Sequence, residues 1–249
     1  MLVYTTFSVT ARCARSGAFG VAVATRVPAV GSVVPHVRAG VGAIATQALT
    51  NPYIGIHGLD LLAAGGDAVR TRDAIAAWDP DIERRQFALV DAAGGVAAHT
   101  GAATHDHAGH RLGDGVVIAG NLLTGPEVLD AMVVTYDDAA PRAEDAGGAA
   151  AAFAAAELAF AERLLRTLEA GQAAGGDRRG KQSAALRVVR DEAYPFVDLR
   201  VDDHADPIPE LRRLFGVWRE LLLPYLPERP TRASLAARGA AARPTLGRD

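Results

Sequence analysis

The sequence predicts an α+β fold in which helices cover sheets that are buried on both faces. Two observations lead to this class. Segments with a two-residue apolar repeat share the chain with segments that repeat every 3.6 residues, so both strands and helices are present. Several strand segments are apolar at nearly every position, which is typical of strands covered on both faces. Two packed sheets with helices outside satisfy this pattern, and so does a single sheet with helices on both faces.

The first half of the chain is predicted to consist mainly of strands. Residues 5–12 alternate between polar and apolar side chains, and the turn CARSGA joins them to the strand FGVAVAT in a hairpin. VGAIATQA is a further buried strand, RRQFALVDAAGGVAAHTG is a second hairpin, and VVIAGNLL is one more strand. Two short helices, separated by the glycines at 65–66, precede the second hairpin.

The second half is predicted to be richer in helix. Residues 126–138 and 148–170 read as helices, the second with an apolar side chain every three or four residues. Gly175 and Gly176 are expected to end that helix with positive φ angles. The strands QSAALRVVR and FVDLRV follow, and the Asp-Pro pair at 206–207 predicts the N-cap and first residue of a last helix.

Composition excludes several classes of function. The 249 residues, 49% of them hydrophobic, suffice for one large domain, expected at 6–226 between a short segment 1–5 and a flexible tail 227–249. A net charge of −3 supplies no basic surface for nucleic acid. No apolar run approaches the ~20 residues that span a bilayer, and no signal peptide is recognisable. The single cysteine, Cys13, excludes an intramolecular disulfide. We therefore expect a cytoplasmic protein without membrane or nucleic-acid partners.

A series of sequence blocks resembles one known family. They include TFSV, GVAVATR, NPYIGIHGLDLL, RRQFALVD and GNLL, and the most specific are GGDRRGKQSAAL and DLRVDDHADP. From Thr6 to about Leu214 the chain resembles the bacterial domain-of-unknown-function 1028 family. The resemblance implies the N-terminal-nucleophile (Ntn) hydrolase fold, a four-layer αββα sandwich of two packed, mainly antiparallel sheets with helices outside. It favours the first of the two arrangements above.

Within that resemblance, Thr6 is the expected nucleophile. Family members begin with Met followed by Thr-Phe/Tyr-Ser, and the matching residue here is Thr6 of TTFSV. On a strand, Thr6, Ser8 and Thr10 share one face, as they also would in an ordinary strand without catalytic function. An N-terminal threonine uses its own α-amino group as general base, so the mechanism requires removal of residues 1–5. Because Leu2 is too large for simple methionine trimming, we expect cleavage before Thr6 by another route.

Polar residues at the ends of other strands are candidates for the same site. A hairpin brings Thr25 and Arg26 beside Thr6, where Arg26 is expected to lower the pKa of the amine or to hold a substrate carboxylate. The side-chain amide or backbone N–H of Asn121 is a candidate for stabilising an oxyanion. Five further residues are expected to contact substrate: Thr46, Gln47, His99, Thr100 and Lys181. Structural hydrogen bonds, turn formation and a solvated arginine are the competing interpretations.

No metal or cofactor is expected. His105, His107 and His110 lie in one loop without companion cysteines or a clear carboxylate partner, unlike zinc motifs. GGDRRGK follows a helix and precedes a strand, the reverse of a phosphate loop. GAFGVA lacks the third glycine of a dinucleotide-binding fingerprint.

The sequence thus leads to two hypotheses. The first is an Ntn amidohydrolase that cleaves an amide-like C–N bond of a small acidic molecule through a threonine acyl-enzyme. The alternative is a non-catalytic binding or assembly module of the same fold whose N-terminus stays unprocessed. Homo-oligomerisation is a further expectation, because alanine-rich chains with glycine-rich strands often self-associate.

Overall fold

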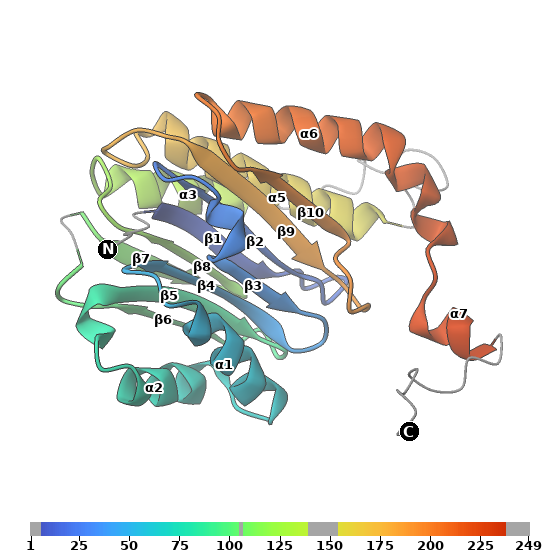
Figure 1. Ribbon diagram of the computed structural model, residues 1–249, viewed down its shortest axis with the longest axis horizontal. Helices are drawn as coiled ribbons and strands as arrows, with labels where there is room; N and C mark the ends of the chain where they lie inside the picture. The colour runs from blue at the N-terminus through green and yellow to red at the C-terminus, as the bar shows by residue number, and fades with distance from the viewer. Residues whose placement is uncertain (1–5, 105–106, 139–153, 238–249) are drawn as a thin grey trace, which may run out of the picture.

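The protein, seen in a computed structural model, is described over residues 6–104, 107–138 and 154–237. Two antiparallel sheets pack face to face, and helices cover the outer face of each, so the fold has four layers (Figure 1). The predicted αββα sandwich is confirmed, and the single-sheet arrangement is excluded. The predictions for residues 1–5, for His105, for the helix start at 148–153 and for residues 238–249 lie outside the described residues.

One sheet has six strands in the order β10-β9-β2-β1-β8-β7, all paired antiparallel. The first strand of the chain therefore lies inside the sheet and not at its edge. Its predicted hairpin with the second strand is confirmed. The strands are β1 (Thr6–Arg12), β2 (Phe19–Thr25), β7 (Gly109–Gly113), β8 (Val116–Gly120), β9 (Ser183–Val189) and β10 (Val197–Val201).

The other sheet has four strands in the order β3-β4-β5-β6, again antiparallel. It contains the second predicted hairpin. Its strands are β3 (Pro35–Arg38), β4 (Gly42–Ala48), β5 (Arg85–Asp91) and β6 (Val96–Thr100).

The helices divide between the two outer faces (Figure 1). α1 (Pro52–Ala63) and α2 (Ala68–Trp78) cover the four-stranded sheet, whereas α3 (Glu127–Asp138), α5 (Ala155–Ala173) and α6 (Pro207–Leu221) cover the six-stranded sheet. Shorter helical turns are η1 (Val30–Ser32), η2 (Ile82–Arg84), η3 (Leu223–Glu228) and α7 (Arg232–Ala237). No helix in these described ranges is long and apolar enough to cross a bilayer.

Strand alternation sorts the apolar side chains into three cores, one between each pair of neighbouring layers. On β1, Phe7 and Val9 face the helices α3 and α5, so Thr6, Ser8 and Thr10 face the other sheet. The core between the sheets consists of valine and alanine, apart from Phe19. The predicted common face of Thr6, Ser8 and Thr10 is thus an inter-sheet face, which is the feature that positions the candidate site.

Some local predictions are confirmed and others differ. Gly175 and Gly176 follow α5 with φ angles of 118° and 62°, as a glycine C-cap requires. Asp206 occupies the N-cap position of α6, but its side chain makes no capping hydrogen bond and pairs with Lys181. β3 and β7 were not predicted, because both are short and begin at a proline or glycine. The helix α7 lies within the segment expected to be a flexible tail.

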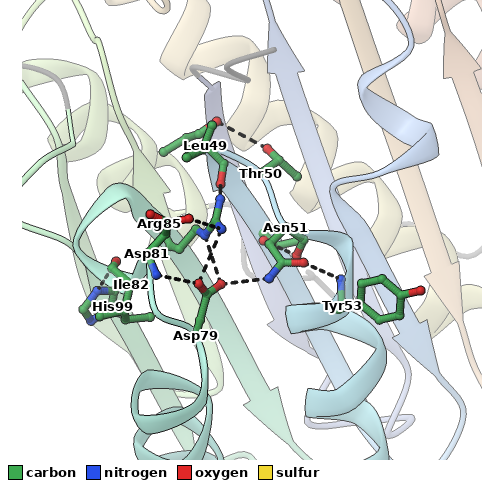
Figure 2. Close-up of polar contacts among 11 residues, drawn as sticks. Leu49, Thr50, Asn51, Tyr53, Asp79, Asp81, Ile82, Arg85 and His99 are labelled. Atoms are coloured by element: carbon green, nitrogen blue, oxygen red, sulfur yellow. Dashed lines mark hydrogen bonds and ion pairs between the residues drawn. The ribbon is translucent and has the colours of Figure 1, made fainter. Parts of the chain in front are cut away.

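A buried charged cluster ties the helices α1 and α2 to the four-stranded sheet (Figure 2). The Asp79 carboxylate accepts hydrogen bonds from Asn51 Nδ2 at 2.8 Å, Arg85 Nε at 3.0 Å and the backbone N–H of Asp81 at 2.9 Å. Arg85 also donates to the backbone carbonyl of Leu49. Burial alone raises the pKa of Asp79, but the hydrogen bonds from Asn51 and Arg85 outweigh it, so the pKa lies below its ordinary value.

Candidate active site

A row of buried polar side chains crosses the six-stranded sheet at one end of the sandwich. Thr6 pairs with Thr25 on β2, and Thr25 pairs with Ser183 on β9. On the other side of β1, Phe7 pairs with Gly120, and the backbone N–H of Asn121 donates to the Thr6 carbonyl at 3.0 Å. All four polar side chains are at most 1% exposed. Thr6 is therefore flanked by Thr25 on β2 and by Asn121, the residue that follows β8, and all three side chains face the second sheet.

The four-stranded sheet presents a matching row at the same end. Gln47 on β4 pairs with Gln86 on β5, and Gln86 pairs with Thr100 on β6. The alternation that points Ala45, Ala88 and Ala98 into the inter-sheet core also points these three side chains there. Two polar rows, one from each sheet, thus face each other across this end of an otherwise apolar layer.

Hydrogen bonds join the two rows through Gln86, which is fully buried. Gln86 Oε1 accepts from Gln47 Nε2 at 2.7 Å and from Asn121 Nδ2 at 2.9 Å. Gln86 Nε2 lies 2.8 Å from the carbonyl oxygen of Gly120, 3.0 Å from that of Gly109 and 2.9 Å from Thr100 Oγ1. Gln86 therefore connects both sheets with a single amide.

The network extends in two directions from this amide. Ser8 Oγ donates to Gln47 Oε1 at 2.9 Å, which ties β1 to β4. Thr100 Oγ1 lies 2.9 Å from His110 Nδ1 on β7. Burial, and then the neighbouring charges of His99 and Arg111, lower the pKa of His110, so its imidazole is neutral at pH 7. Neither arm of the network carries a formal charge at neutral pH.

One acceptor in this network has no donor. Asn121 Oδ1 is buried and makes no hydrogen bond within the described part of the chain. A buried acceptor left without a donor costs ~1–3 kcal/mol, so proteins rarely retain one. Asn121 lies beside Thr6, and this unfilled acceptor is therefore at the candidate nucleophile.

The backbone near the two rows is strained. Among the described residues other than glycine, positive φ angles occur at Ala48 (67°), Leu122 (51°), Ala29 (57°) and His107 (52°). Ala48 immediately follows Gln47, and Leu122 immediately follows Asn121. Such conformations cost about 1–3 kcal/mol each and concentrate at functional sites. Both sheets thus place a strained residue directly after a member of the polar rows.

The rim of this end is formed by the loop between α5 and β9. The backbone N–H of Gln182 donates to the Thr25 carbonyl at 2.8 Å, and the Arg26 N–H donates to the buried Asp177 carboxylate at 3.2 Å. The exposed Arg26 guanidinium donates to Gln182 Oε1 at 2.7 Å, and Lys181 forms an ion pair with Asp206. Arg26 therefore contacts this loop at the rim, and Lys181, which belongs to the loop, ties it to the start of α6.

Two of the expected substrate contacts lie on the opposite face of the four-stranded sheet. Thr46 Oγ1 donates to the Asn51 carbonyl at 3.1 Å. The His99 ring stacks on Phe87, with centroids 5.5 Å apart, and its Nε2 lies 3.0 Å from the Ile82 carbonyl. Phe87 belongs to the core under α1 and α2. The structure therefore brings Thr6, Thr25, Gln47, Thr100 and Asn121 together but separates Thr46 and His99 from them.

No group of three or more potential metal ligands occurs among the described residues. Of the histidine loop, His110 takes part in the polar network through Thr100, and His107 is exposed. The structure does not describe His105.

Sequence reasoning missed Gln86, the centre of the network. A signal for it exists: in RRQFALVD, Gln86 has the same strand parity as Ala88 and Val90, which face the inter-sheet core. An uncharged amide at an inward position of a buried strand needs several hydrogen-bond partners. It therefore indicates a buried polar network.

Comparisons with known proteins agree with this architecture. The crystal structure of a DUF1028-family protein from Silicibacter pomeroyi is 28% identical, has a TM-score of 0.78, and the match covers 92% of this chain and 97% of that chain. Anbu, the ancestral β-subunit from Yersinia bercovieri, is 12% identical with a TM-score of 0.36, over 90% of this chain and 98% of that chain, which is too low to bear on function. No curated protein matches. The model of the family of unknown function DUF1028 matches residues 6–211, and this range includes Thr6, Gln86 and Asn121. The chain therefore belongs to the DUF1028 family.

Proposed function

We propose that this protein is an Ntn-type amidohydrolase with Thr6 as nucleophile, acting on an amide-like C–N bond of a small acidic molecule. The observation that carries the proposal is the position of Thr6. It lies on a central strand, between Thr25 and Asn121 and opposite the buried row of Gln47, Gln86 and Thr100. The unfilled acceptor of Asn121 and the strained backbone at Ala48 and Leu122 support a functional role for this end.

The chemistry needs Thr6 to be the first residue. Hydrolysis of the Thr5–Thr6 peptide bond would free the Thr6 α-amino group, whose ordinary pKa of about 8 suits proton transfer at neutral pH. The amine accepts the Oγ proton as Oγ attacks the substrate carbonyl carbon. The resulting ammonium gives this proton to the departing amine as the C–N bond breaks. Water, activated by the same amine, then hydrolyses the Thr6 ester and releases the acid.

Neighbouring residues have defined parts in this scheme. Both Thr25 and Asn121 are cross-strand neighbours of Thr6, so their side chains are within reach of its amine. Asn121 is not the oxyanion donor expected from the sequence, because its backbone N–H donates to Thr6 and its side-chain Nδ2 to Gln86. Arg26 hydrogen-bonds the neutral side-chain amide of Gln182 at the rim, so its charge is available to a substrate carboxylate. Lys181 precedes Gln182 in the rim loop and forms an ion pair with Asp206. Gln47 and Thr100 fix the facing row. Thr46 and His99, on the outer face, support the sheet and do not contact substrate.

The first experiment asks whether Thr6 becomes N-terminal. Periodate oxidises a free 1,2-amino alcohol, so it modifies an N-terminal threonine and no internal one. Intact-mass analysis of the purified protein, with periodate treatment after denaturation, should show loss of residues 1–5 and conversion of the N-terminal threonine to a glyoxylyl group, which releases acetaldehyde and ammonia. A chain that retains Met1 and resists periodate overturns the proposal.

The second experiment asks whether Thr6 is nucleophilic. A β-lactone electrophile should acylate the folded, cleaved protein on one residue, and peptide mapping should place the acyl group on Thr6. Thr6→Ser should retain labelling and Thr6→Ala should lose it. Thr10→Val, on the same face of β1, is the matched control and should label as the wild type does. Acylation at any other residue contradicts the assignment.

One observation favours the second candidate function, a non-catalytic module. The Thr6 side chain is 0% exposed, and most polar groups around it are satisfied by each other. A protein that never exposes Thr6 would use this end of the sandwich only as a structural tie. Retention of residues 1–5, together with absence of labelling, would establish this alternative. Homo-oligomerisation stays a prediction from the sequence.

A further inference from the structure

The orientation of three buried amides is determined by two backbone carbonyls. The carbonyls of Gly109 and Gly120 only accept hydrogen bonds, so the Gln86 atom facing them, at 3.0 and 2.8 Å, must be the NH₂ group. Gln86 Oε1 then faces the other way, toward Gln47 and Asn121, and requires NH₂ groups from both. Gln47 Oε1 consequently accepts from Ser8. Turning any one amide by 180° would place like atoms against each other.

This chain of orientations ends at Asn121, which is turned so that its carbonyl oxygen has no donor among the residues that the structure describes. Reversing the Asn121 amide would set Oδ1 against Gln86 Oε1, so Asn121 cannot fill its own acceptor by rotation. Gln86 thus holds a buried acceptor unfilled beside Thr6. Such an arrangement is costly unless a donor arrives from elsewhere.

We infer that the missing donor is the α-amino group of Thr6, and that Gln86 is a positioning residue acting through Asn121. Thr6 and Asn121 are cross-strand neighbours joined by a backbone hydrogen bond, and such pairs have Cβ atoms about 4.5–5.5 Å apart. The α-amino nitrogen and the Asn121 side chain are therefore within reach of each other. The inference rests on the proposed function, because it needs Thr6 to be N-terminal.

The contact would do two things for the amine. An N–H directed at Asn121 Oδ1 fixes the rotation of the amino group about the N–Cα bond. The other positions on the nitrogen then remain available for proton transfer to and from Thr6 Oγ. A hydrogen bond to a charged donor is stronger than one to a neutral donor, so the acceptor favours the ammonium form. Loss of the Gln86 amide frees Asn121 to rotate, and the ammonium loses this support.

The test measures the protonation of the Thr6 amine in the protein that has lost only residues 1–5. The threonines are labelled with ¹⁵N, and NMR monitors the Thr6 amine as the pH is changed. Gln86→Met replaces the amide with an unbranched side chain of similar shape. We expect it to reduce the ratio of ammonium to amine at a given pH by about tenfold, the change that corresponds to one hydrogen bond to a charged group. Asn121→Ala should give the same reduction.

The double variant separates positioning from general disturbance. If Gln86 acts through Asn121, Gln86→Met combined with Asn121→Ala should change the titration no more than either single variant. Thr10→Val, in the same inter-sheet layer, should leave the titration unchanged. If Gln86→Met fails to fold, the cleaved wild-type protein still tests the inference. Its Asn121 side-chain amide should keep one orientation, and the hydrogens of this amide should exchange slowly with solvent.

The outcomes distinguish the inference from the proposed function. Retention of residues 1–5 overturns the proposed function and the inference with it. Cleavage at Thr6 with an unchanged amine titration in Gln86→Met and Asn121→Ala overturns the inference alone. Rapid exchange or rotation of the Asn121 amide in the cleaved wild type also overturns it.

Discussion

Two buried polar clusters in this protein differ in charge and in completeness. Around Asp79, a carboxylate and the Arg85 guanidinium form an ion pair with side chains only 1% and 11% exposed (Figure 2). Asn51 and the Asp81 amide complete the hydrogen bonds of the carboxylate. The side chains that hydrogen-bond Gln86 are neutral, and one acceptor, Asn121 Oδ1, has no donor within the described ranges of the chain.

The difference is the one expected between a structural tie and a catalytic site, which is the role that we propose for the end of the sandwich at Gln86. The Asp79 cluster connects the start of α1 and the end of α2 to the first residue of β5, and both oxygens of its carboxylate accept hydrogen bonds. The Gln86 cluster connects two sheets but keeps an acceptor beside Thr6. A purely structural network needs complete satisfaction of its hydrogen bonds. The unfilled Asn121 Oδ1 departs from this rule, as does Thr10 Oγ1 in the same layer, and Asn121 differs from Thr10 in lying beside Thr6.

The largest effect is expected from breaking the charged cluster. Asp79→Ala leaves Arg85 buried without its main partner, and removal of one member of a buried ion pair costs about 3–5 kcal/mol in the free energy of unfolding. Asp81→Ala is the matched control, since Asp81 is 52% exposed and lies 3.5 Å from the same guanidinium, and it should cost at most about 1 kcal/mol. Denaturant unfolding measures both. Equal costs would show that the Asp79 cluster is not the structural tie described.

Acid should weaken the same cluster without mutation. The folded pKa of Asp79 lies below its ordinary value, so the folded state holds fewer protons than the unfolded state as the pH approaches that range. The contribution of Asp79 is complete above the unfolded pKa and is lost as pH falls through the folded pKa. In the wild type, the free energy of unfolding should therefore fall as the pH drops below about 4. We expect the part of this fall that comes from Asp79 to be absent in Asp79→Asn.

A third prediction concerns the strained backbone beside the neutral cluster. Ala48 has a φ of 67°, whereas Ala45 lies inside the same strand, and both are buried. Glycine substitution removes the same methyl group and adds the same unfolded-state entropy at each position, but it relieves strain only at residue 48. Ala48→Gly should therefore cost about 1–3 kcal/mol less than Ala45→Gly in denaturant unfolding. Equal costs would indicate that residue 48 is unstrained.

The smallest effect is expected at Thr10, whose buried hydroxyl has no hydrogen bond in the described chain. Thr10→Val keeps the shape and removes the unsatisfied group, so stability should rise by about 1 kcal/mol. Unlike Asn121, Thr10 is two strand positions beyond Ser8 and away from Thr6. A loss of stability would mean that an unfilled polar group in this layer is not by itself evidence of a missing partner.

Much of the fold follows from the sequence because the strands carry their own periodicity. The face shared by Thr6, Ser8 and Thr10 was predicted from alternation alone and is the inter-sheet face. Alternation does not say which of two sheets a strand joins, and here the choice between one sheet and two depended on a family resemblance. The short strands β3 and β7 carry too few residues for a repeat to be visible.

The candidate site was predicted in part for the same reason. Residues that end strands were expected to assemble, and Thr25, Gln47, Thr100 and Asn121 do lie together with Thr6. His99 and Thr46 end their strands at the same place but with the opposite parity, so they face α1 and α2. Parity counted from Ala45 and Ala98 would have separated these residues. The pairing of Gln86 with Asn121 joins positions 35 residues apart, and no local pattern contains it.

The central place of β1 has a consequence for any chain that starts at Thr6. Terminal residues normally fray because nothing restrains them on one side. Here the Thr6 carbonyl accepts a hydrogen bond from the backbone N–H of Asn121, and the next residue, Phe7, is paired with both β2 and β8. The sheet would therefore restrict the rotational freedom of a terminal residue before any substrate binds. A terminal threonine held in this way would not have to lose rotational freedom when substrate binds. This loss of freedom in advance is how proximity lowers a reaction barrier.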